Sequence, residues 1–238
     1  MSVSVVLPVF KQSTDIGQVL REYTDTLKTL PLDCELIVVV NGGDTASHGA
    51  CLAVAAVEPS VRVLFIEQAG WGRAVRIGLK SAKGSLICYT NSARTSASAL
   101  TSLIALGAEH CDTVLMAMRR IREGWCRRAG SLLYNIECRA LFDLATWDVN
   151  GTPKVFPRHF DHLLALTRDD DLIDLEFNLV CQRERYPVVQ VPVFSARRGG
   201  GRSTTNWRSA ARLYWGAYEL WRDRPKAPDD AGAGQARA

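Results

Sequence analysis

The sequence predicts an α/β protein whose central sheet is mostly parallel and is covered by helices on both faces. Short apolar runs of strand length alternate with segments of helical length over the first half of the chain. A helical segment between successive strands is the pattern of a parallel sheet. Continuous apolar runs, such as residues 36–40, are typical of strands that are buried on both sides.

Five strands are expected in the first half of the chain, where β-branched and aromatic residues gather in short runs. These strands cover residues 3–7, 35–40, 61–66, 86–89 and 113–118. Helices are expected between them, and the last of these helices would begin with Thr95 or Ser96 as its cap. The helical ranges are 14–30, 45–57, 72–82 and 96–109.

The regular alternation ends after Arg119. The second half predicts a long helix over 126–145, a turn over 148–153, a short apolar piece at 155–157, a helix over 173–185, a strand over 188–193 and a Gly-rich loop over 199–204. An amphipathic helix then carries Trp207, Tyr214, Trp215, Tyr218 and Trp221. We expect residues 1–224 to form a single domain. Residues 225–238 are rich in Pro, Asp, Ala and Gly, which predicts a disordered C-terminal tail.

Composition excludes several classes of protein. With 238 residues, of which 47% are hydrophobic and 23% charged, the chain can bury a full core and is not mainly disordered. No apolar run reaches the roughly 18–20 residues of a membrane helix, and the first residues lack the basic start of a signal peptide. The seven cysteines are scattered, which indicates reduced thiols. We therefore expect a cytoplasmic protein, with peripheral association at the inner face of the membrane as an option.

Basic residues are concentrated in two stretches. The chain has 29 Lys and Arg against 25 Asp and Glu, and arginines crowd into 119–128 and 197–212. Planar guanidinium groups are suited to phosphate or carboxylate recognition, although a solvated basic surface is the alternative for any single arginine. Nucleic acid is not expected as a partner, because no nucleic-acid-binding motif accompanies the charge.

Polar turns follow three of the expected strands, at residues 8–12, 41–45 and 91–94. Open α/β sheets bind ligands beyond the carboxyl ends of their strands, so these turns are candidate binding segments. The alternative is that their Gly, Asn and Thr residues serve only as turn formers and caps. The glycines at 70, 72 and 78 do not form a dinucleotide fingerprint, because they follow the third strand and the last glycine comes too late.

An ordered set of short motifs runs from residue 3 to about residue 215. The motifs are Val5-Val-Leu-Pro-Val-Phe10, Glu35-Leu-Ile-Val-Val-Val-Asn-Gly42, Gly70-Trp-Gly-Arg-Ala74, Gly78-Leu-Lys-Ser-Ala-Lys-Gly84, Arg127 with Ser131 and Asn135, Asp148 with Gly151, Lys154-Val-Phe-Pro-Arg158, Asp174-Leu-Glu176, Val191-Pro-Val193, and Arg198 with Gly201 and Ser203. In this order they resemble the family 2 glycosyltransferases of GT-A fold, most closely the dolichol- or polyprenyl-phosphate mannose synthase branch.

The resemblance implies an inverting transfer of a sugar from a nucleotide-diphospho-sugar, with GDP or UDP as the nucleotide, to an acceptor for which a polyprenyl phosphate is favoured. The positions that it assigns to the nucleotide-sugar are Pro8, Phe10, Gln12, Asn41, Gly70, Gly72, Asn91, Ala93, Arg198 and Ser203, and the charge of Arg202 adds that residue to the set. Gln12 stands where the family usually has Glu, and Asn41 where it has Asp. Arg119, Arg127 and Ser131 would meet the acceptor phosphate, and the last two share one helix face at i, i+4.

The sequence departs from the family after the fourth strand. Family members carry Asp-x-Asp there and use Mg or Mn to neutralise the leaving diphosphate, whereas this chain has Asn91-Ser92-Ala93 followed by Arg94. We expect no metal ligands here. One hypothesis is a metal-independent transferase in which Arg94, Arg198 or Arg202 balances the diphosphate. The other is a catalytically silent nucleotide-sugar-binding or scaffold protein that partners an active transferase.

Two carboxylates are candidates for a catalytic base. A lipid phosphate is already a nucleophile, but a hydroxyl acceptor would need a carboxylate to remove its proton. Asp148 and Glu176 are the candidates, with turn stabilisation and a solvated charge as their respective alternatives. The aromatic C-terminal helix is interleaved with arginines, so it is expected either to lie on a membrane surface or to pack on the domain.

Overall fold

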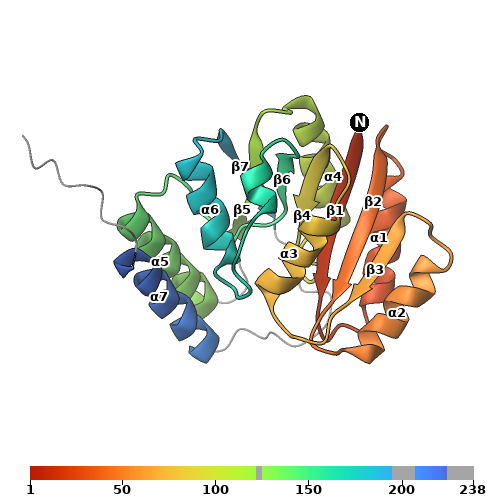
Figure 1. Ribbon diagram of the computed structural model, residues 1–238, viewed down its shortest axis with the longest axis horizontal. Coiled ribbons are helices and arrows are strands. Elements are labelled where there is room, and N and C mark those ends of the chain that lie inside the picture. Colours follow the sequence, from red (N-terminus) through yellow and green to blue (C-terminus); the bar gives the residue numbers. More distant parts are fainter. Residues whose placement is uncertain (122–124, 195–206, 224–238) are drawn as a thin grey trace, which may run out of the picture.

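The computed structural model describes residues 1–121, 125–194 and 207–223, and seven strands in these ranges form one sheet (Figure 1). The strand order is β3-β2-β1-β4-β6-β5-β7. All paired strands are parallel except β6, which runs antiparallel to both of its neighbours. The strands are β1 Ser2–Val9, β2 Asp33–Val40, β3 Val61–Phe65, β4 Leu86–Tyr89, β5 Val114–Ile121, β6 Lys154–Pro157 and β7 Val188–Phe194.

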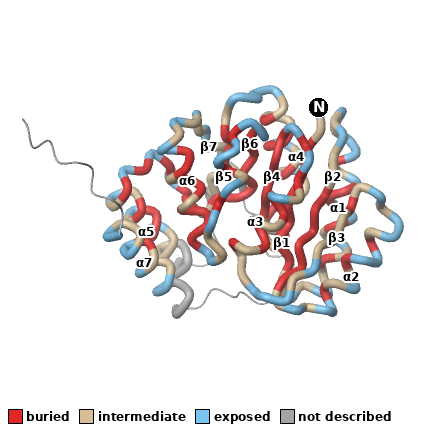
Figure 2. Tube along the Cα trace, viewed as in Figure 1, coloured by how far each residue is buried: buried red, intermediate tan, exposed pale blue. Residues whose placement is uncertain are grey.

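Helices cover both faces of this sheet, as predicted. The helices are α1 Ile16–Leu27, α2 Thr45–Ala55, α3 Trp71–Ser81, α4 Ala97–Glu109, α5 Trp125–Phe142, α6 Ile173–Arg183, α7 Trp207–Arg222 and the short 3-10 helix η1 Asp161–Leu164. α1, α2 and α4 contribute to the apolar core on one face, while α3, η1 and α6 contribute to the core on the other. Figure 2 shows the central strands β1, β4 and β6 buried between these layers, whereas the edge strands β3 and β7 are partly exposed. Among the described residues, no helix is both long and apolar enough to cross a membrane.

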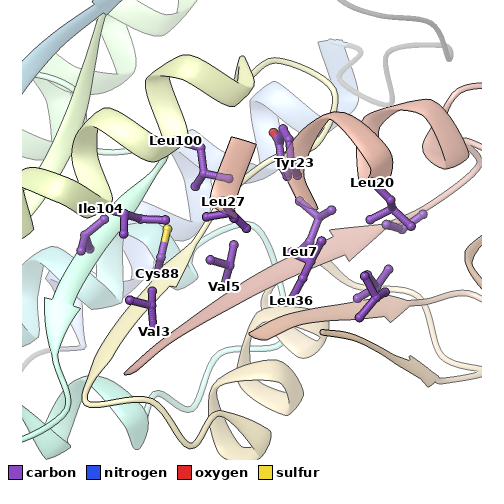
Figure 3. Close-up of a cluster of buried hydrophobic side chains, with 14 of the residues drawn as sticks. Val3, Val5, Leu7, Leu20, Tyr23, Leu27, Leu36, Cys88, Leu100 and Ile104 are labelled. Atoms are coloured by element: carbon purple, nitrogen blue, oxygen red, sulfur yellow. The ribbon is translucent and has the colours of Figure 1, made fainter. Parts of the chain in front are cut away.

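Alternation along β1 assigns its side chains to the two cores. Val3, Val5 and Leu7 point towards α1 and α4, where they meet Tyr23 and Leu100 among others (Figure 3). Val6, between them, belongs to the opposite core. Burial on both faces explains why the run from Val3 to Val9 is apolar almost throughout, which is the pattern of a central parallel strand.

A third apolar cluster lies under α5 and α7, at one end of the sheet (Figure 1). It contains Tyr134 and Cys138 of α5, Leu175 of α6 and Ala217 of α7. α5 and α7 touch through the rings of Tyr134 and Tyr214, whose centroids are 5.7 Å apart. The aromatic C-terminal helix therefore packs on the domain through one of its sides.

The structure corrects the expected elements in two places. The piece at 155–157 belongs to the strand β6, which is inserted antiparallel between β4 and β5: all four of its residues pair with β4, and Lys154 and Val155 also pair with β5. So short a run does not reveal its direction or its neighbours. The helix expected over 126–145 ends earlier, at Phe142, because Asp143 has a φ of 53°, a left-handed conformation that ends helices.

Candidate functional site

The turns after β1, β2 and β4 lie together, because these three parallel strands are neighbours in the order β2-β1-β4. The Ser92 hydroxyl donates to Gln12 Oε1 over 2.6 Å, and the backbone N–H of Gln12 donates to Ser47 Oγ over 3.0 Å. The Lys11 N–H donates to Asp44 Oδ2 over 2.7 Å. The three polar turns predicted from the sequence thus form one hydrogen-bonded edge at the carboxyl ends of the strands.

Asn41 is the buried junction of this edge. Its Nδ2 donates to the Val9 carbonyl over 2.9 Å, and its Oδ1 accepts from the Gly70 N–H over 3.3 Å. The amide therefore ties the end of β1 to the start of α3. A carboxylate at this position could accept from Gly70 but could not donate to Val9, which gives a local reason for Asn in place of the family's Asp.

Pro8 and Phe10 border the same edge. Pro8 is buried inside β1, opposite Val39 of β2. Phe10 is half-buried beyond the strand, and its ring fills the space where Gly42 has no side chain. A Cβ on Gly42 would lie 2.5 Å from Phe10 Cε2, and the residue has a φ of 75°, so glycine is required by both space and backbone.

Gly70 and Gly72 at the start of α3 pack against the loop of residues 167–170. A Cβ on Gly70 would lie 2.6 Å from the Asp169 carbonyl oxygen, and one on Gly72 would lie 2.5 Å from the Arg168 carbonyl oxygen. The Arg73 side chain fastens the same loop by an ion pair of 2.7 Å to Asp169. In this structure the two glycines make room for a protein loop, and their predicted approach to a nucleotide remains a prediction.

Glu176 organises that loop from α6. Its Oε1 accepts from the N–H and the hydroxyl of Thr167 over 2.8 and 2.7 Å, and its Oε2 accepts from the Arg168 N–H over 2.9 Å. Both carboxylate oxygens are engaged, so Glu176 is a loop-positioning residue rather than a merely solvated charge. Its role as a base remains a prediction.

The turn that follows β4 does not fit a divalent cation. Asn91 Oδ1 accepts from the Ala93 N–H over 2.9 Å, and the buried Ser92 hydroxyl is directed to Gln12. Arg94 is half-buried beside them. Hard divalent ions bind several oxygen ligands, usually including carboxylates, and residues 91–94 contain no carboxylate. Across the described parts of the chain, no three His, Cys, Asp or Glu side chains gather closely enough to hold a metal ion.

Arg119 at the end of β5 and Asp148 before β6 form a bidentate ion pair. Arg119 Nε and Nη2 donate to the two oxygens of Asp148, each over 2.8 Å, and the Arg119 N–H adds a third bond of 3.1 Å. Burial lowers the pKa of Arg119, but the hydrogen bonds and charge of Asp148 outweigh this and raise the pKa overall. From the sequence, Asp148 is a candidate base and Arg119 a candidate ligand of the acceptor phosphate, whereas in the structure the two residues are partners.

A second ion pair, which the sequence analysis did not identify, lies between β4, β6 and α6. The ammonium of Lys154, fully buried on β6, binds the carboxylate of Asp174 on α6. Asp174 also accepts from the Tyr89 hydroxyl over 2.8 Å and from Trp71 Nε1 over 3.1 Å. Burial is the largest influence on the Lys154 pKa and lowers it, although Asp174 opposes the shift. The sequence feature that could have revealed this ion pair is Lys154 itself, a charged residue in the otherwise apolar run of β6.

These two ion pairs influence each other electrostatically. Asp174 helps to raise the pKa of Arg119, while Arg119 helps to lower that of Lys154. Burial, with the charge and hydrogen bond of Asp174, raises the pKa of Tyr89, so this phenol stays protonated. Asp148, Asp174, Arg119 and Lys154 thus form a buried cluster of paired charges. Asp174 can hold Trp71 in place, and the pair of Arg119 with Asp148 can hold the β5–β6 connection.

The predicted acceptor residues are only partly described. Ser131 is half-buried on α5, and the backbone of Arg127 lies one turn before it. The side chain of Arg127, together with Arg198, Arg202, Ser203 and the predicted tail at 225–238, lies outside the residues that the structure describes.

A comparison with protein families identifies the group to which this chain is related. The model of "Glycosyl transferase family 2" matches residues 4–141, which is more than half of the chain. The chain belongs to glycosyl transferase family 2. The matched part runs from β1 to the end of α5 and includes the hydrogen-bonded edge described above.

Among individual curated proteins, the chain is similar to the undecaprenyl-phosphate 4-deoxy-4-formamido-L-arabinose transferase of Enterobacter sp. (strain 638). It is 25% identical over 218 residues, which are 90% of this chain and 65% of the relative. This family 2 chain thus spans less than two thirds of the relative's length.

Solved structures place the chain in the GT-A fold. The glucosyl-3-phosphoglycerate synthase of Mycobacterium tuberculosis in complex with Mn2+, UDP and phosphoglyceric acid superposes with a TM-score of 0.73 and 17% identity, over 95% of this chain and 80% of that one. A second structure of that enzyme, with Mn2+, UDP-glucose and phosphoglyceric acid, gives 0.72 and 18%, over 95% and 81%. At these identities the likeness concerns the fold alone.

Proposed function

We propose that this family 2 chain transfers a sugar from a nucleotide-diphospho-sugar to a polyprenyl phosphate. The observation that carries the proposal is the hydrogen-bonded edge at the carboxyl ends of three parallel strands, in which Ser92 donates to Gln12 and Asn41 joins Val9 to Gly70. Ligands of open α/β sheets bind at this edge. The name of the curated relative, an undecaprenyl-phosphate sugar transferase, supports the choice of acceptor.

In the proposed reaction, an oxygen of the lipid phosphate attacks the anomeric carbon of the sugar. The new C–O bond forms as the bond to the diphosphate oxygen breaks, and the nucleoside diphosphate leaves with that electron pair. Attack from the side opposite the leaving group inverts the anomeric carbon. The lipid phosphate is already ionised, so no general base is needed. Asp148 and Glu176 then act as positioning residues, and a base role for either belongs only to a hydroxyl acceptor.

Donor binding is assigned to the edge and to the segment that follows β7. Phe10 would border the base, while Gln12, Asn41 and the Asn91–Ala93 turn would contact the nucleotide or the sugar. Pro8, Gly70 and Gly72 shape this edge. Arg198, Arg202 and Ser203 complete the assignment. The nucleotide of the donor, UDP or GDP, is the quantity that the binding experiment below determines.

Charge is the reason to propose that the transfer needs no metal. The leaving diphosphate gains negative charge, and the turn after β4 provides Arg94 in place of carboxylates that would hold a cation. Guanidinium groups bind diphosphate oxygens with strong, charge-assisted hydrogen bonds. Arg94, with Arg198 or Arg202, would stabilise the leaving group as the metal does elsewhere.

On the acceptor side, Arg127 and Ser131 on α5 would bind the lipid phosphate, together with Arg119 of β5, whose guanidinium is held by Asp148. A polyprenyl phosphate keeps its chain in a membrane, so the reaction would take place at the membrane surface. We place the chain at the cytoplasmic face, as a peripheral protein, since nucleotide-sugars are the donors.

The first test is binding of UDP-, GDP- and dTDP-sugars, measured by thermal shift with excess EDTA and then with excess Mn²⁺ or Mg²⁺. A ligand that binds the native state raises its apparent stability. We expect one donor class to raise the melting temperature equally with and without metal. The absence of a shift with every donor would instead favour the silent scaffold.

The second test is transfer of the selected sugar to a polyprenyl phosphate in detergent, with EDTA present. Arg94→Ala should lower kcat by roughly 100-fold, the usual cost of a group that stabilises transition-state charge. Arg21→Ala removes an exposed arginine of α1 and serves as the matched control. Activity that requires Mn²⁺, or that is unchanged in Arg94→Ala, would contradict the metal-independent mechanism.

A further inference from the structure

Trp71, the first residue of α3, is anchored by its ring nitrogen. Its Nε1 donates to Asp174 Oδ2 over 3.1 Å, and the half-buried ring packs against the core that α3 and α6 share. The backbone is fixed at the same point, because the N–H of Gly70 donates to Asn41 Oδ1 over 3.3 Å. A tryptophan that is held at its backbone and at its indole nitrogen keeps one orientation.

The carboxylate that anchors Trp71 is itself held in place. Asp174 is only 4% exposed, binds the buried ammonium of Lys154 and accepts from the Tyr89 hydroxyl over 2.8 Å. The Lys154 ammonium lies over the rings of Tyr89 and Phe177, at 5.3 and 5.4 Å from their centroids. The position of the Asp174 carboxylate is therefore fixed by neighbours on three elements, and the indole of Trp71 is fixed by that carboxylate.

These contacts place the indole of Trp71 beside the candidate donor site. The backbone just before Trp71 is tied to Asn41 at the end of β2, and its ring is tied through Asp174 to Tyr89 at the end of β4. β1 lies between these two strands, so the ring lies beside the carboxyl edge to which the donor is assigned. The turn with Arg94, assigned to the diphosphate, begins two residues after Tyr89.

An open pocket of about 430 Å³ adjoins the start of α3. It is lined by Thr167, Arg168, Asp169 and Asp170. Backbone oxygens of this loop face the glycines on either side of Trp71, at positions 70 and 72. The volume is within the roughly 300–1,000 Å³ of small-molecule sites. Hydroxyl, guanidinium and carboxylate groups such as those of the lining form the hydrogen bonds that sugar hydroxyls need.

The ring face of Trp71 is the part that is left for a ligand. Its polar side-chain atom, the indole nitrogen, is used by Asp174. The base of the nucleotide is already assigned to Phe10, whose ring packs on Gly42 at the end of β2 rather than beside β4. An apolar aromatic face next to hydrogen-bonding groups suits a sugar ring, which has C–H groups on its faces and hydroxyls at its rim.

We infer that Trp71 packs against the hexose of the donor and is a specificity-determining residue for that sugar. The inference rests on the proposed function, because it requires a nucleotide-sugar at this edge. The loop at 167–170 would meet the sugar hydroxyls. Asp174 acts through Trp71 and is a positioning residue, which Tyr89 and Lys154 support.

The test compares a nucleoside diphosphate with its sugar by isothermal titration calorimetry, with UDP and UDP-glucose as one pair and GDP and GDP-mannose as the other. Each titration is run with EDTA and again with Mn²⁺. The measured quantity is the Kd of the nucleotide-sugar divided by the Kd of the free diphosphate. A change that merely loosened the fold would weaken both ligands and leave this ratio unchanged.

Two variants and one control separate the ring from its anchor. Trp71→Ala removes the ring, whereas Trp71→Phe keeps a ring but removes the N–H that binds Asp174. Trp147→Ala is the matched control, because Trp147 is 56% exposed and stacks on Arg139 instead, whose guanidinium carbon is 4.0 Å from the ring centroid.

Trp71→Ala should raise the ratio roughly tenfold, the upper scale of one aromatic contact, and leave the Kd of the free diphosphate unchanged. Trp71→Phe should raise it about threefold, because the ring stays but is no longer anchored. Trp147→Ala should match the wild type. An unchanged ratio in both Trp71 variants would overturn the inference. If Trp71→Ala does not fold, the ratio in Trp71→Phe decides by itself.

The two proposals fail separately in this design. If the wild type binds neither the diphosphates nor their sugars, the proposed function is wrong and the inference falls with it. If the wild type binds both members of a pair and the Trp71 variants keep its ratio, only the inference is wrong.

Discussion

Arg119 and Asp148 are bound to each other by two side-chain hydrogen bonds of 2.8 Å, in a nearly buried position between the end of β5 and the turn before β6. Each residue is a candidate for direct chemistry when taken alone. Paired, they also hold together two segments that are 29 residues apart. The pair therefore has a structural effect that can be measured without knowledge of the substrate.

Asp148→Ala should lower the free energy of unfolding by about 3 kcal/mol or more, because it leaves the Arg119 guanidinium buried without its partner. Urea denaturation at pH 7 would measure the change. Removing both charges in Arg119→Met, Asp148→Leu should cost less than the sum of the single changes. The matched surface control is Lys28→Ala, which breaks an exposed pair with Glu58 and should have a much smaller effect, because solvent screens that pair. Equal losses in Asp148→Ala and Lys28→Ala would contradict a buried pair.

Asn41→Asp should destabilise the fold by about 1–3 kcal/mol at pH 7, because a carboxylate cannot donate to the Val9 carbonyl and would lie against it. The carboxylate is disfavoured beside the Val9 carbonyl, which raises its folded pKa above the ordinary value near 4, so the loss should shrink as the pH falls towards about 4 and be smallest below it, where the protonated acid can donate. Asn91→Asp is the control, since Asn91 Oδ1 only accepts from Ala93 and a carboxylate can do the same. Similar stability of the two variants across this pH range would rule out the proposed role of the Asn41 amide.

Gly78→Ala should destabilise the fold by about 1–3 kcal/mol, because its Cβ would lie 2.1 Å from Val6 Cγ1, where α3 packs on β1. Gly49→Ala in α2 meets no atom within 4 Å and should stabilise the helix by about 0.5–1 kcal/mol. Comparing the free energies of unfolding of the two variants, by thermal or urea denaturation, separates the effect of packing from that of helix propensity. A stabilising Gly78→Ala would mean that α3 does not approach the sheet this closely.

Asp44→Ala should cost about 1 kcal/mol at neutral pH, since Asp44 caps α2 by accepting from the Ser47 N–H over 3.2 Å. Burial raises the pKa of Asp44, but the bonds from Ser47 and Lys11 outweigh it and lower the pKa overall. A lowered folded pKa means that this stabilisation is fully present above the ordinary value near 4 and is lost as the pH falls through the folded value. The stability difference between wild type and Asp44→Ala, measured by urea denaturation at a series of pH values, should therefore vanish in acid, and a difference that stays constant from pH 7 to acid would contradict this role.

Much of the secondary structure could be predicted from local pattern, because burial and propensity act on neighbouring residues. The continuous apolar run of β2 identifies a strand buried on both faces, and Ser96 before α4 identifies a cap that accepts from the Ala99 N–H over 3.2 Å. The ordered motifs were similarly sufficient to indicate the family, which the match over residues 4–141 confirms.

From the sequence, the candidate site could be predicted only as the polar turns that follow β1, β2 and β4, without the contacts between them. Parallel topology brings the carboxyl ends of β1, β2 and β4 to one edge, so the meeting of Gln12 with Ser92 follows once the strand order is known. The partners of Asp148 and Glu176 could not be predicted, because each carboxylate is satisfied by groups that approach through the tertiary fold.

The sequence by itself determined the alternation of strands and helices, the polar turns after β1, β2 and β4, and the family resemblance, since these are carried by residue type and spacing. Only the tertiary structure decided the antiparallel insertion of β6, which sets Lys154 opposite Tyr89 on one side and Met116 on the other. It likewise decided that Tyr214 packs inward while Trp215 stays exposed. The physical reason is that charge pairing and exposure depend on segments distant in sequence, whose register no local pattern specifies.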